Sequence, residues 1–394
     1  MPCITDIEGV FANGMHAGIK PSLKKDLAYI YLPKAYATAG VFTRNQFTAS
    51  SVDHTKTCIQ KGVLKAMVIN SGNANAGTGQ AGAVHTKQIA KKAAQLLGLK
   101  PSEVGVASTG RIGEALPVDK ILKGLETMLQ NPLASEGHQA SEAILTTDLC
   151  AKETWHSKTV GGKKITVAGF TKGSGMIAPN MATTLTFLAT NVQVKKVDLQ
   201  RLLREAVNDS FNMLSVDTDT STNDMLLLFS SGEKKCELNT GEEWEAFKKV
   251  LWGACIDLAK KIAKDGEGAT KLIEVQVTGA AKGQDARTIA KNIVNSPLVK
   301  TALHGGDPNW GRIMAAACRE PQLKLNIQKL VLTLGGHVIF EKGMPALFSR
   351  EAVVTVLKKD NILIQLDLNL GKAKATAWGC DLTKGYIDIN VEYS

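Results

Sequence analysis

Residues 172–191 constrain the fold of this chain more than any other stretch. Their sequence, KGSGMIAPNMATTLTFLATN, is a glycine-rich loop that runs directly into a strand-like segment opening with Thr183 and Thr184. If the peptide bond between Ala182 and Thr183 were cut, Thr183 would carry a hydroxyl group and a free α-amine on one residue. Such an amine titrates at about pH 8, so at neutral pH it can act as the general base for its own hydroxyl. The segment therefore suggests an N-terminal nucleophile.

A purely structural interpretation of the same threonines stands beside this one. Thr183, Thr184 and Thr186 are β-branched, and β-branched residues are common on half-buried strands. Both interpretations predict a strand after the loop, and only the catalytic one requires a cut.

Seven further blocks spread along the chain accompany this segment. They are INSGNANAGTG at 69–79, ASTGRIGEALP at 107–117, TTD at 146–148, SFN with DTDTSTND at 210–224, DGEGATK at 265–271, DPNWGRI at 307–313 and INVEYS at 389–394. In this order the eight segments resemble the ArgJ family, the glutamate N-acetyltransferases that are also called ornithine acetyltransferases. Within that resemblance, residues 172–191 match the family's self-cleavage site.

The resemblance implies an α/β (α+β) fold of the DmpA/ArgJ type. It is an αββα layered arrangement similar to the N-terminal-nucleophile hydrolases in architecture but different in connectivity. The precursor is expected to cut itself before Thr183, which gives an α chain of residues 1–182 and a β chain of residues 183–394 that stay associated. A Gly-Ala-Ala-Lys-Gly turn at 279–283 marks the candidate start, near residue 280, of a strand-rich C-terminal lobe.

The resemblance also assigns site residues. Attack on an acetyl amide builds negative charge on the carbonyl oxygen, and preorganised donors stabilise that charge. Thr109 and Gly110 match the family's oxyanion residues, at a turn where glycine lets backbone amides approach a substrate closely. The positions that match the family's substrate-binding residues are Thr146, Lys172, Thr183, Glu267, Asn390 and Ser394.

The implied reaction moves an acetyl group in two half-reactions. Thr183 takes the acetyl group from N2-acetylornithine, ornithine leaves, and glutamate then attacks the acetyl-threonine. No cofactor is implied, and acetyl-CoA as a second acetyl donor stays open. The family suggests an α2β2 assembly. A self-processing amidase or aminopeptidase that releases the acyl group to water is the alternative enzyme, and a binding protein that needs no cut is a second alternative.

The sequence departs from the family pattern at several positions, among them Gly77, where the family commonly has cysteine, Thr218, where it commonly has glycine, and residues 304–306, which precede DPNWGRI. Thr184 stands where the family more often has methionine, so a second hydroxyl lies next to the predicted nucleophile. The chain ends at Ser394, about one residue earlier than the family's usual ending, which weakens the assignment of Ser394.

The composition is consistent with a globular enzyme. With 394 residues, 44% of them hydrophobic, the chain can bury a substantial core and is long enough for two lobes. It has no run of about 18 apolar residues that would predict a membrane helix. Asp6 and Glu8 stand where a signal peptide would be basic and then apolar. We therefore expect a cytoplasmic protein without a membrane partner.

The net charge of +10 raises nucleic-acid binding as a hypothesis. The lysines are dispersed in small groups, without a dense arginine tract and with few aromatic residues beside them, which favours a solvated surface over a nucleic-acid groove. The seven cysteines form no CxxC motif, and the seven histidines form neither HExxH nor HxH. Asp217, Asp219 and Asp224 lack the spacing of an EF-hand. We therefore expect no nucleic-acid partner and no metal.

Periodicity predicts alternating helices and strands. The predicted helices span residues 84–97, 117–129, 197–211 and 242–263. The predicted strands span residues 104–107, 164–170, 273–278, 323–327, 330–334, 353–357 and 362–370.

Overall fold

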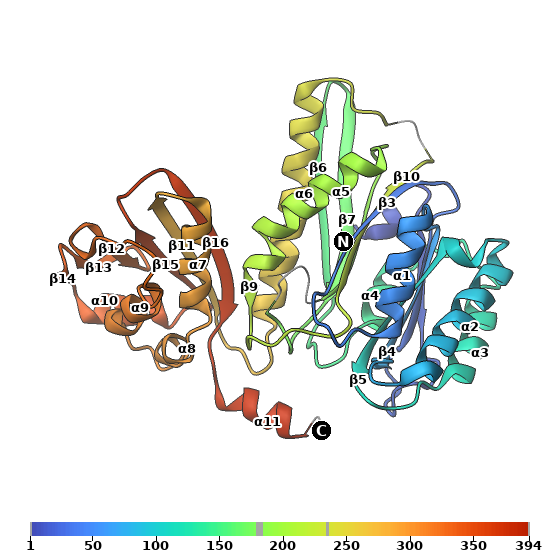
Figure 1. The fold of residues 1–394 in the computed structure, drawn as a ribbon, viewed down its shortest axis with the longest axis horizontal. Helices are drawn as coiled ribbons and strands as arrows, with labels where there is room; N and C mark the ends of the chain where they lie inside the picture. Colours follow the sequence, from blue (N-terminus) through green and yellow to red (C-terminus); the bar gives the residue numbers. More distant parts are fainter. Residues whose placement is uncertain (1, 179–183, 234–235, 393–394) are drawn as a thin grey trace. The chain divides into compact units, whose positions relative to one another are not determined.

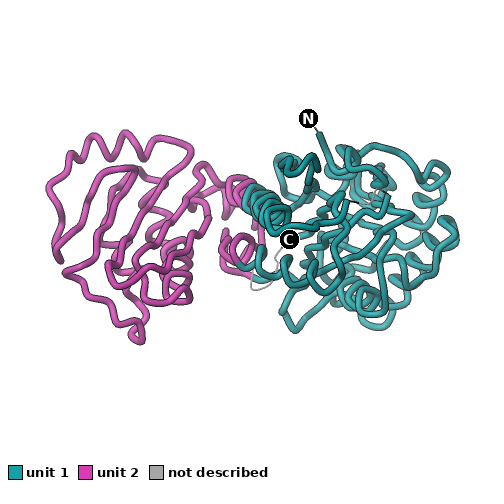
Figure 2. Tube along the Cα trace, turned by 90° about the horizontal axis from the view of Figure 1, so that it is seen from above, with its two compact units in different colours: residues 1–173, 180–208, 220–258 teal, residues 174–179, 209–219, 259–394 magenta. Residues whose placement is uncertain are grey.

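The computed structural model describes residues 2–178, 184–233 and 236–392. These residues form two compact units, coloured separately in Figure 2. Unit 1 holds the described residues within 1–173, 180–208 and 220–258, and unit 2 holds those within 174–179, 209–219 and 259–394. The chain therefore enters unit 2 twice, briefly, before its C-terminal part completes that unit.

Unit 1 is built on two β-sheets. The four-stranded sheet has the order β1 (Phe11–Met15), β2 (Leu27–Tyr31), β4 (Ala66–Asn73) and β5 (Val104–Arg111). The five-stranded sheet has the order β3 (Ala35–Phe42), β10 (Met225–Ser231), β8 (Leu185–Thr190), β7 (Lys163–Lys172) and β6 (Lys152–Val160). Within these sheets β4 pairs with β5 and β8 with β10 in parallel, while the other neighbours are antiparallel.

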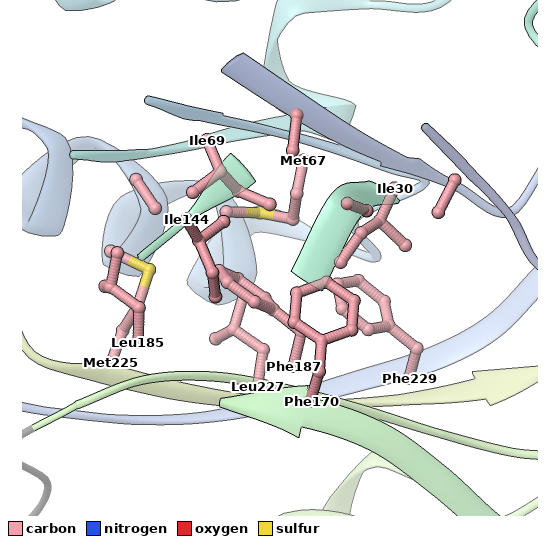
Figure 3. Packing of buried hydrophobic residues seen from close by; sticks show 14 of the residues in the cluster. Ile30, Met67, Ile69, Ile144, Phe170, Leu185, Phe187, Met225, Leu227 and Phe229 are labelled. Atoms are coloured by element: carbon pink, nitrogen blue, oxygen red, sulfur yellow. The ribbon is translucent and has the colours of Figure 1, made fainter. Parts of the chain in front are cut away.

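The two sheets enclose one apolar core. Alternate residues of β8, namely Leu185, Phe187 and Ala189, join the same buried cluster as Ile30 of β2 and Ile69 of β4. Figure 3 shows the side chains of Ile30, Ile69, Leu185 and Phe187 meeting between the sheets. The period-two alternation of each strand gives the sheet one face for this core and one for a helix layer.

Helices cover the outer faces of both sheets (Figure 1). A second buried cluster joins the four-stranded sheet to α2 (Gly79–Leu97) and α3 (Val118–Met128). On the five-stranded sheet, Gln200 of α5 (Lys196–Asp209) exchanges two hydrogen bonds with the backbone of Gly40 in β3. Asp257 of α6 (Gly241–Lys264) accepts one from Thr154 of β6. The shorter helices α1 (Ser50–Lys61) and α4 (Gly137–Ala143) complete the unit. Unit 1 thus has the predicted αββα layers.

Unit 2 is built on a seven-stranded sheet. Its order is β14 (Met344–Pro345), β13 (His337–Glu341), β12 (Val331–Leu334), β15 (Asn361–Asp367), β11 (Leu272–Ala280), β16 (Ala373–Cys380) and β9 (Leu214–Ser215). Its helices are α7 (Gly283–Val294), α8 (Pro297–His304), α9 (Trp310–Ala317), α10 (Arg350–Leu357) and α11 (Lys384–Glu392). Short 3-10 turns lie at Ile4–Asp6, Pro101–Glu103, Phe211–Met213 and Ile327–Lys329.

Two predicted strands are wrong. Residues 353–357 belong to α10, because Ser349 caps the helix by accepting from the Ala352 amide, and Val353 and Leu357, four residues apart, are both buried. This capped apolar stripe overrides the β-propensity of a valine-rich run. Residues 323–327 form no strand, because local turns use their backbone and Asn326 caps the 3-10 turn that follows.

The turn at 279–283 does not open a new unit. It joins β11 to α7 inside unit 2, whose C-terminal part begins at Ala259. β11 belongs to the same sheet as the strands that follow, pairing with β15 and β16. Among the described residues, no helix is long and apolar enough to cross a membrane.

Candidate active site

The predicted nucleophile lies outside the described residues. Thr183, the preceding Ala182 and the C-terminal Ser394 all fall in segments that the structure does not describe. The nearest described residue is Thr184, which directly precedes β8. The site is therefore built from the residues that surround Thr184.

The hydroxyl of Thr184 belongs to a buried chain of threonines. Its Oγ1 lies 2.7 Å from Oγ1 of Thr186, which lies 2.6 Å from Oγ1 of Thr171 on β7. All three residues are buried. The hydroxyl of Thr186 thus links β8 to β7, and the second hydroxyl next to the predicted nucleophile, that of Thr184, is bonded to it.

The parallel strand β10 begins beside Thr184. The Met225 amide donates to the Thr184 carbonyl oxygen at 3.0 Å, which places Asp224 at the same level of the sheet. Asp224 is buried, and its Oδ2 has no hydrogen-bond partner among the described residues. Burial raises the pKa of Asp224 well above its usual value, and hydrogen bonds from Ser221 together with the charge of Lys172 oppose this only in part. The carboxyl group is therefore stabilised in its neutral form.

The predicted oxyanion residues lie on a distorted pair of strands. Thr109 and Gly110 end β5, where Gly110 pairs with Gly72 of β4 and Asn73 pairs with both Thr109 and Arg111. Gly110 has φ +134°, and a Cβ there would lie 2.3 Å from the Gly72 carbonyl carbon. Only glycine fits this close approach of two backbones.

Asn223 ties this pair of strands to the start of β10. Its Nδ2 donates to the backbone oxygens of Ser108 at 2.8 Å and Ala74 at 2.6 Å. Since Asn223 precedes Asp224, one buried amide joins the predicted oxyanion strand to the strand that flanks Thr184. Asn223 was not among the predicted site residues. Its position in the DTDTSTND block was the only signal that the sequence offered.

The predicted substrate residues Thr146 and Lys172 are in direct contact. Lys172 Nζ donates to Thr146 Oγ1 at 2.8 Å, and Lys172 is only 8% exposed. Both are held by Asp148, which lies 3.8 Å from Lys172 Nζ and accepts from the amides of Thr146 at 3.0 Å and Gly173 at 2.7 Å. Asp148 therefore organises this part of the site, although sequence reasoning gave it no role.

A second buried ammonium shares Asp148. Lys152, 1% exposed, lies 2.6 Å from Asp148. Burial alone raises the pKa of Asp148, but the Lys172 and Lys152 ammonium groups outweigh it and hold the pKa well below its usual range. One carboxylate thus faces two ammonium groups. Thr146 and Asp148 also line a cavity of about 540 Å³.

The predicted residues Glu267 and Asn390 lie in unit 2. Asn390 Nδ2 donates to Glu267 Oε2 at 2.9 Å. The Glu267 amide donates to the Ser174 carbonyl oxygen at 3.1 Å, and Asp217 accepts from the amides of Met176 and Ile177. Asp217 and Glu267 therefore fix the start of the loop that leads towards the predicted cut.

The acidic blocks serve structural purposes where they are described. Asn309 caps α9 by accepting from the Arg312 amide, and Trp310 stacks on Phe340 with ring centroids 5.5 Å apart. Asp307 pairs with Arg350. Within residues 2–178, 184–233 and 236–392, no three His, Cys, Asp or Glu side chains are grouped to hold a metal ion.

Unit 1 is an αββα-layered protein, because its two stacked sheets lie between helix layers. Its candidate site is the polar cluster at the strand ends, where β7, β8 and β10 meet the predicted oxyanion strand. The chain belongs to the ArgJ family, whose model matches residues 11–394. This confirms the resemblance that the sequence blocks indicated.

Individual relatives agree with the family match. The arginine biosynthesis bifunctional protein ArgJ of Bacillus licheniformis is 43% identical over 391 residues, 98% of this chain and 95% of its own. That of Bacillus subtilis is 42% identical over 393 residues, 99% of this chain and 96% of its own. The crystal structure of the Bacillus halodurans protein is 45% identical with a TM-score of 0.50, and the match covers 52% of this chain and 98% of that one.

Replacing Asp148 should destabilise unit 1 severely. Asp148→Asn removes the buried carboxylate that pairs with Lys152 and lies 3.8 Å from Lys172, and breaking a buried pair typically costs about 3–5 kcal/mol. Chemical denaturation measures the loss. Glu205→Gln removes one partner of the exposed Arg201–Glu205 pair and should cost less than about 1 kcal/mol. Because the pKa of Asp148 is depressed, wild-type stability should also fall as the pH drops below about 4. Equal losses in the two variants would contradict the central role of Asp148.

Replacing Asp224 should remove a dependence of stability on pH. Its pKa is raised in the folded protein, so folding binds a proton and wild-type stability should fall as the pH rises above about 4. Asp224→Asn cannot titrate and should unfold at an equal or higher temperature at neutral pH, with a flatter pH profile. Thermal unfolding at several pH values measures this, with Asp219→Asn at an exposed position of the same block as the control. A profile unchanged by Asp224→Asn would show that the carboxyl is ionised.

Proposed function

We propose that this chain is a glutamate N-acetyltransferase of the ornithine acetyltransferase type. It cuts itself between Ala182 and Thr183 and then carries the acetyl group of N2-acetylornithine to glutamate on Thr183. The observation that carries the proposal is the cluster around Thr184. Lys172 and Thr146 are hydrogen-bonded to each other, and Asn223 ties the strand of Thr109 and Gly110 to the strand beside Thr184.

Family membership and the length of a solved relative support the proposal. The relatives are named for arginine biosynthesis, a pathway in which ornithine and glutamate derivatives are substrates. The Bacillus halodurans structure matches 52% of this chain over 98% of its own length. If a precursor is cut near its middle, each of the two resulting chains matches about half of an uncut relative. The half-length match is therefore what such a cut would give.

The first half-reaction transfers the acetyl group to the enzyme. The Thr183 α-amine accepts the hydroxyl proton while Oγ1 attacks the acetyl carbonyl carbon, and Thr109 and Gly110 stabilise the oxyanion. The carbon–nitrogen bond then breaks, the α-ammonium returns the proton to the leaving amine, and ornithine departs. The ammonium of Lys172 suits the α-carboxylate that donor and acceptor share. Glu267, oriented by Asn390, suits the cationic side chain of ornithine.

The second half-reaction is the reverse chemistry with another amine. The α-amine of glutamate attacks the acetyl ester of Thr183, and the Thr183 oxygen leaves and regains its proton.

The proposed enzyme needs no cofactor and works in the cytoplasm as associated α and β chains in an α2β2 assembly. It binds neither membrane nor nucleic acid. An assay with acetyl-CoA and glutamate determines whether acetyl-CoA is a second donor.

The proposed cut is tested by the intact mass of the purified protein. Wild type should give two chains divided between Ala182 and Thr183, and Thr183→Ala should stay whole because it lacks the hydroxyl that attacks the bond. A single chain from both proteins would remove the free amine from the mechanism and end the proposal. Product analysis with and without glutamate then separates acetyl transfer from hydrolysis by a self-processing amidase.

Lys172→Ala should weaken both half-reactions, because donor and acceptor share the α-carboxylate. We expect a loss of kcat/KM of about 10- to 100-fold in each, the scale of one charge-assisted hydrogen bond. Exchange of labelled ornithine into acetylornithine reports the first half-reaction, and acetylation of glutamate reports the whole cycle. Lys158→Ala, at an exposed position on β6, is the control. A loss confined to one substrate would show that Lys172 does not bind the shared group.

A further inference from the structure

Lys20 is fixed in place beside the candidate site by a buried carboxylate. It lies in the segment between β1 and β2, which folds around Asp26. Asp26 is fully buried and accepts hydrogen bonds from the amides of Ala17 at 2.6 Å, Ile19 at 2.7 Å and Lys20 at 2.9 Å. Three backbone amides donate to one carboxylate and hold this segment in one conformation. The backbone position from which the Lys20 side chain extends is therefore preorganised.

The side chain of Lys20 runs along the predicted oxyanion strands. A Cβ on Gly72 would lie 2.9 Å from Lys20 Cγ, which shows that the lysine stem packs directly against Gly72. Gly72 is the register partner of Gly110. The stem of Lys20 is therefore one strand away from a predicted oxyanion residue, and both belong to unit 1.

Lys20 lines the same cavity as Thr146 and Asp148. This cavity, of about 540 Å³, is large enough for an amino-acid substrate. Three other charged groups on its wall are already paired, because Lys25 lies 2.6 Å from Glu142 and Asp148 pairs with Lys152. Lys20 Nζ donates one hydrogen bond, to the Lys25 carbonyl oxygen at 2.8 Å, and forms no ion pair with any described residue.

The ammonium of Lys20 is thus short of partners. An ammonium group has three donors, and the observed bond uses one. Burial lowers the pKa of Lys20 to about 8, an effect that Asp26 opposes and Lys172 increases. The charge of Lys172 acts on Lys20, so the two ammonium groups are neighbours, and Asp26 and Asp148 are the negative charges that act on Lys20.

We propose that the Lys20 ammonium binds the side-chain carboxylate of glutamate, which makes Lys20 the residue that selects a dicarboxylic acetyl acceptor. This inference rests on the proposed function. With Lys172 on the α-carboxylate and Lys20 on the side-chain carboxylate, each end of the acceptor meets an ammonium group. Ornithine has no second carboxylate, so Lys20 contributes nothing attractive to the acetylornithine half-reaction.

The test compares two neutral variants in the two half-reactions. Lys20→Met keeps the length of the side chain, and Lys20→Gln also keeps a donor for the Lys25 carbonyl oxygen. Both should raise the KM for glutamate about 10- to 100-fold and leave ornithine–acetylornithine exchange close to wild type. They should also reduce the preference for glutamate over glutamine, which lacks the charge. Lys20→Arg, which keeps the charge, should restore most of the affinity for glutamate.

Matched controls separate the outcomes. Lys24→Met removes an exposed lysine from the wall of the same cavity, and an equal rise in KM there would show that general positive charge is responsible and would overturn the inference. An unchanged glutamate KM in both neutral Lys20 variants would also overturn it, while exchange and self-cleavage in wild type leave the proposed function standing. If wild type is uncut and catalyses no exchange, the proposed function itself fails.

Discussion

The buried carboxylate of Asp148 is the interaction on which the candidate site depends. It accepts from the backbone on both sides, at Thr146 and at Gly173, and it balances the charges of Lys152 and Lys172. A buried charge is tolerated only when it is paired and hydrogen-bonded. Asp148 therefore supplies one buried negative charge to both lysines.

The two sheets of unit 1 are joined at the site by polar contacts as well as by the apolar core. Asn223 reaches from the start of β10 to the backbone oxygens of Ser108 in β5 and of Ala74, just after β4. Apolar packing between sheets is non-directional and tolerates small displacements. The directional bonds of Asn223 set the separation between the predicted oxyanion strand and Thr184 more tightly than the core alone does.

Sequence patterns predicted the local elements better than the site. The helix ending at Gly98 was predicted because an apolar stripe stops at this glycine. In the structure Gly98 has φ +66°, a conformation that favours glycine. The helix containing Val353 was missed because its valines favour a strand, whereas the Ser349 cap and the burial of Val353 and Leu357 on one face favour a helix. The blocks pointed to the right regions, but Asn223 acts through the distant backbone of Ala74 and Ser108, and Asp148 joins its neighbours Thr146 and Lys152 to the distant Gly173. No local pattern reveals these long-range partners.

The threonine chain that begins at Thr184 has a consequence for a newly made chain end. Ends of polypeptides usually fray, because few contacts oppose their conformational entropy. Here the residue next to the predicted cut is already held through its hydroxyl by Thr186 and through its carbonyl by Met225. A new N-terminus at Thr183 would be attached to a residue that is already held in place. Few torsion angles would then have to be fixed before the Thr183 amine and hydroxyl reach a reactive geometry.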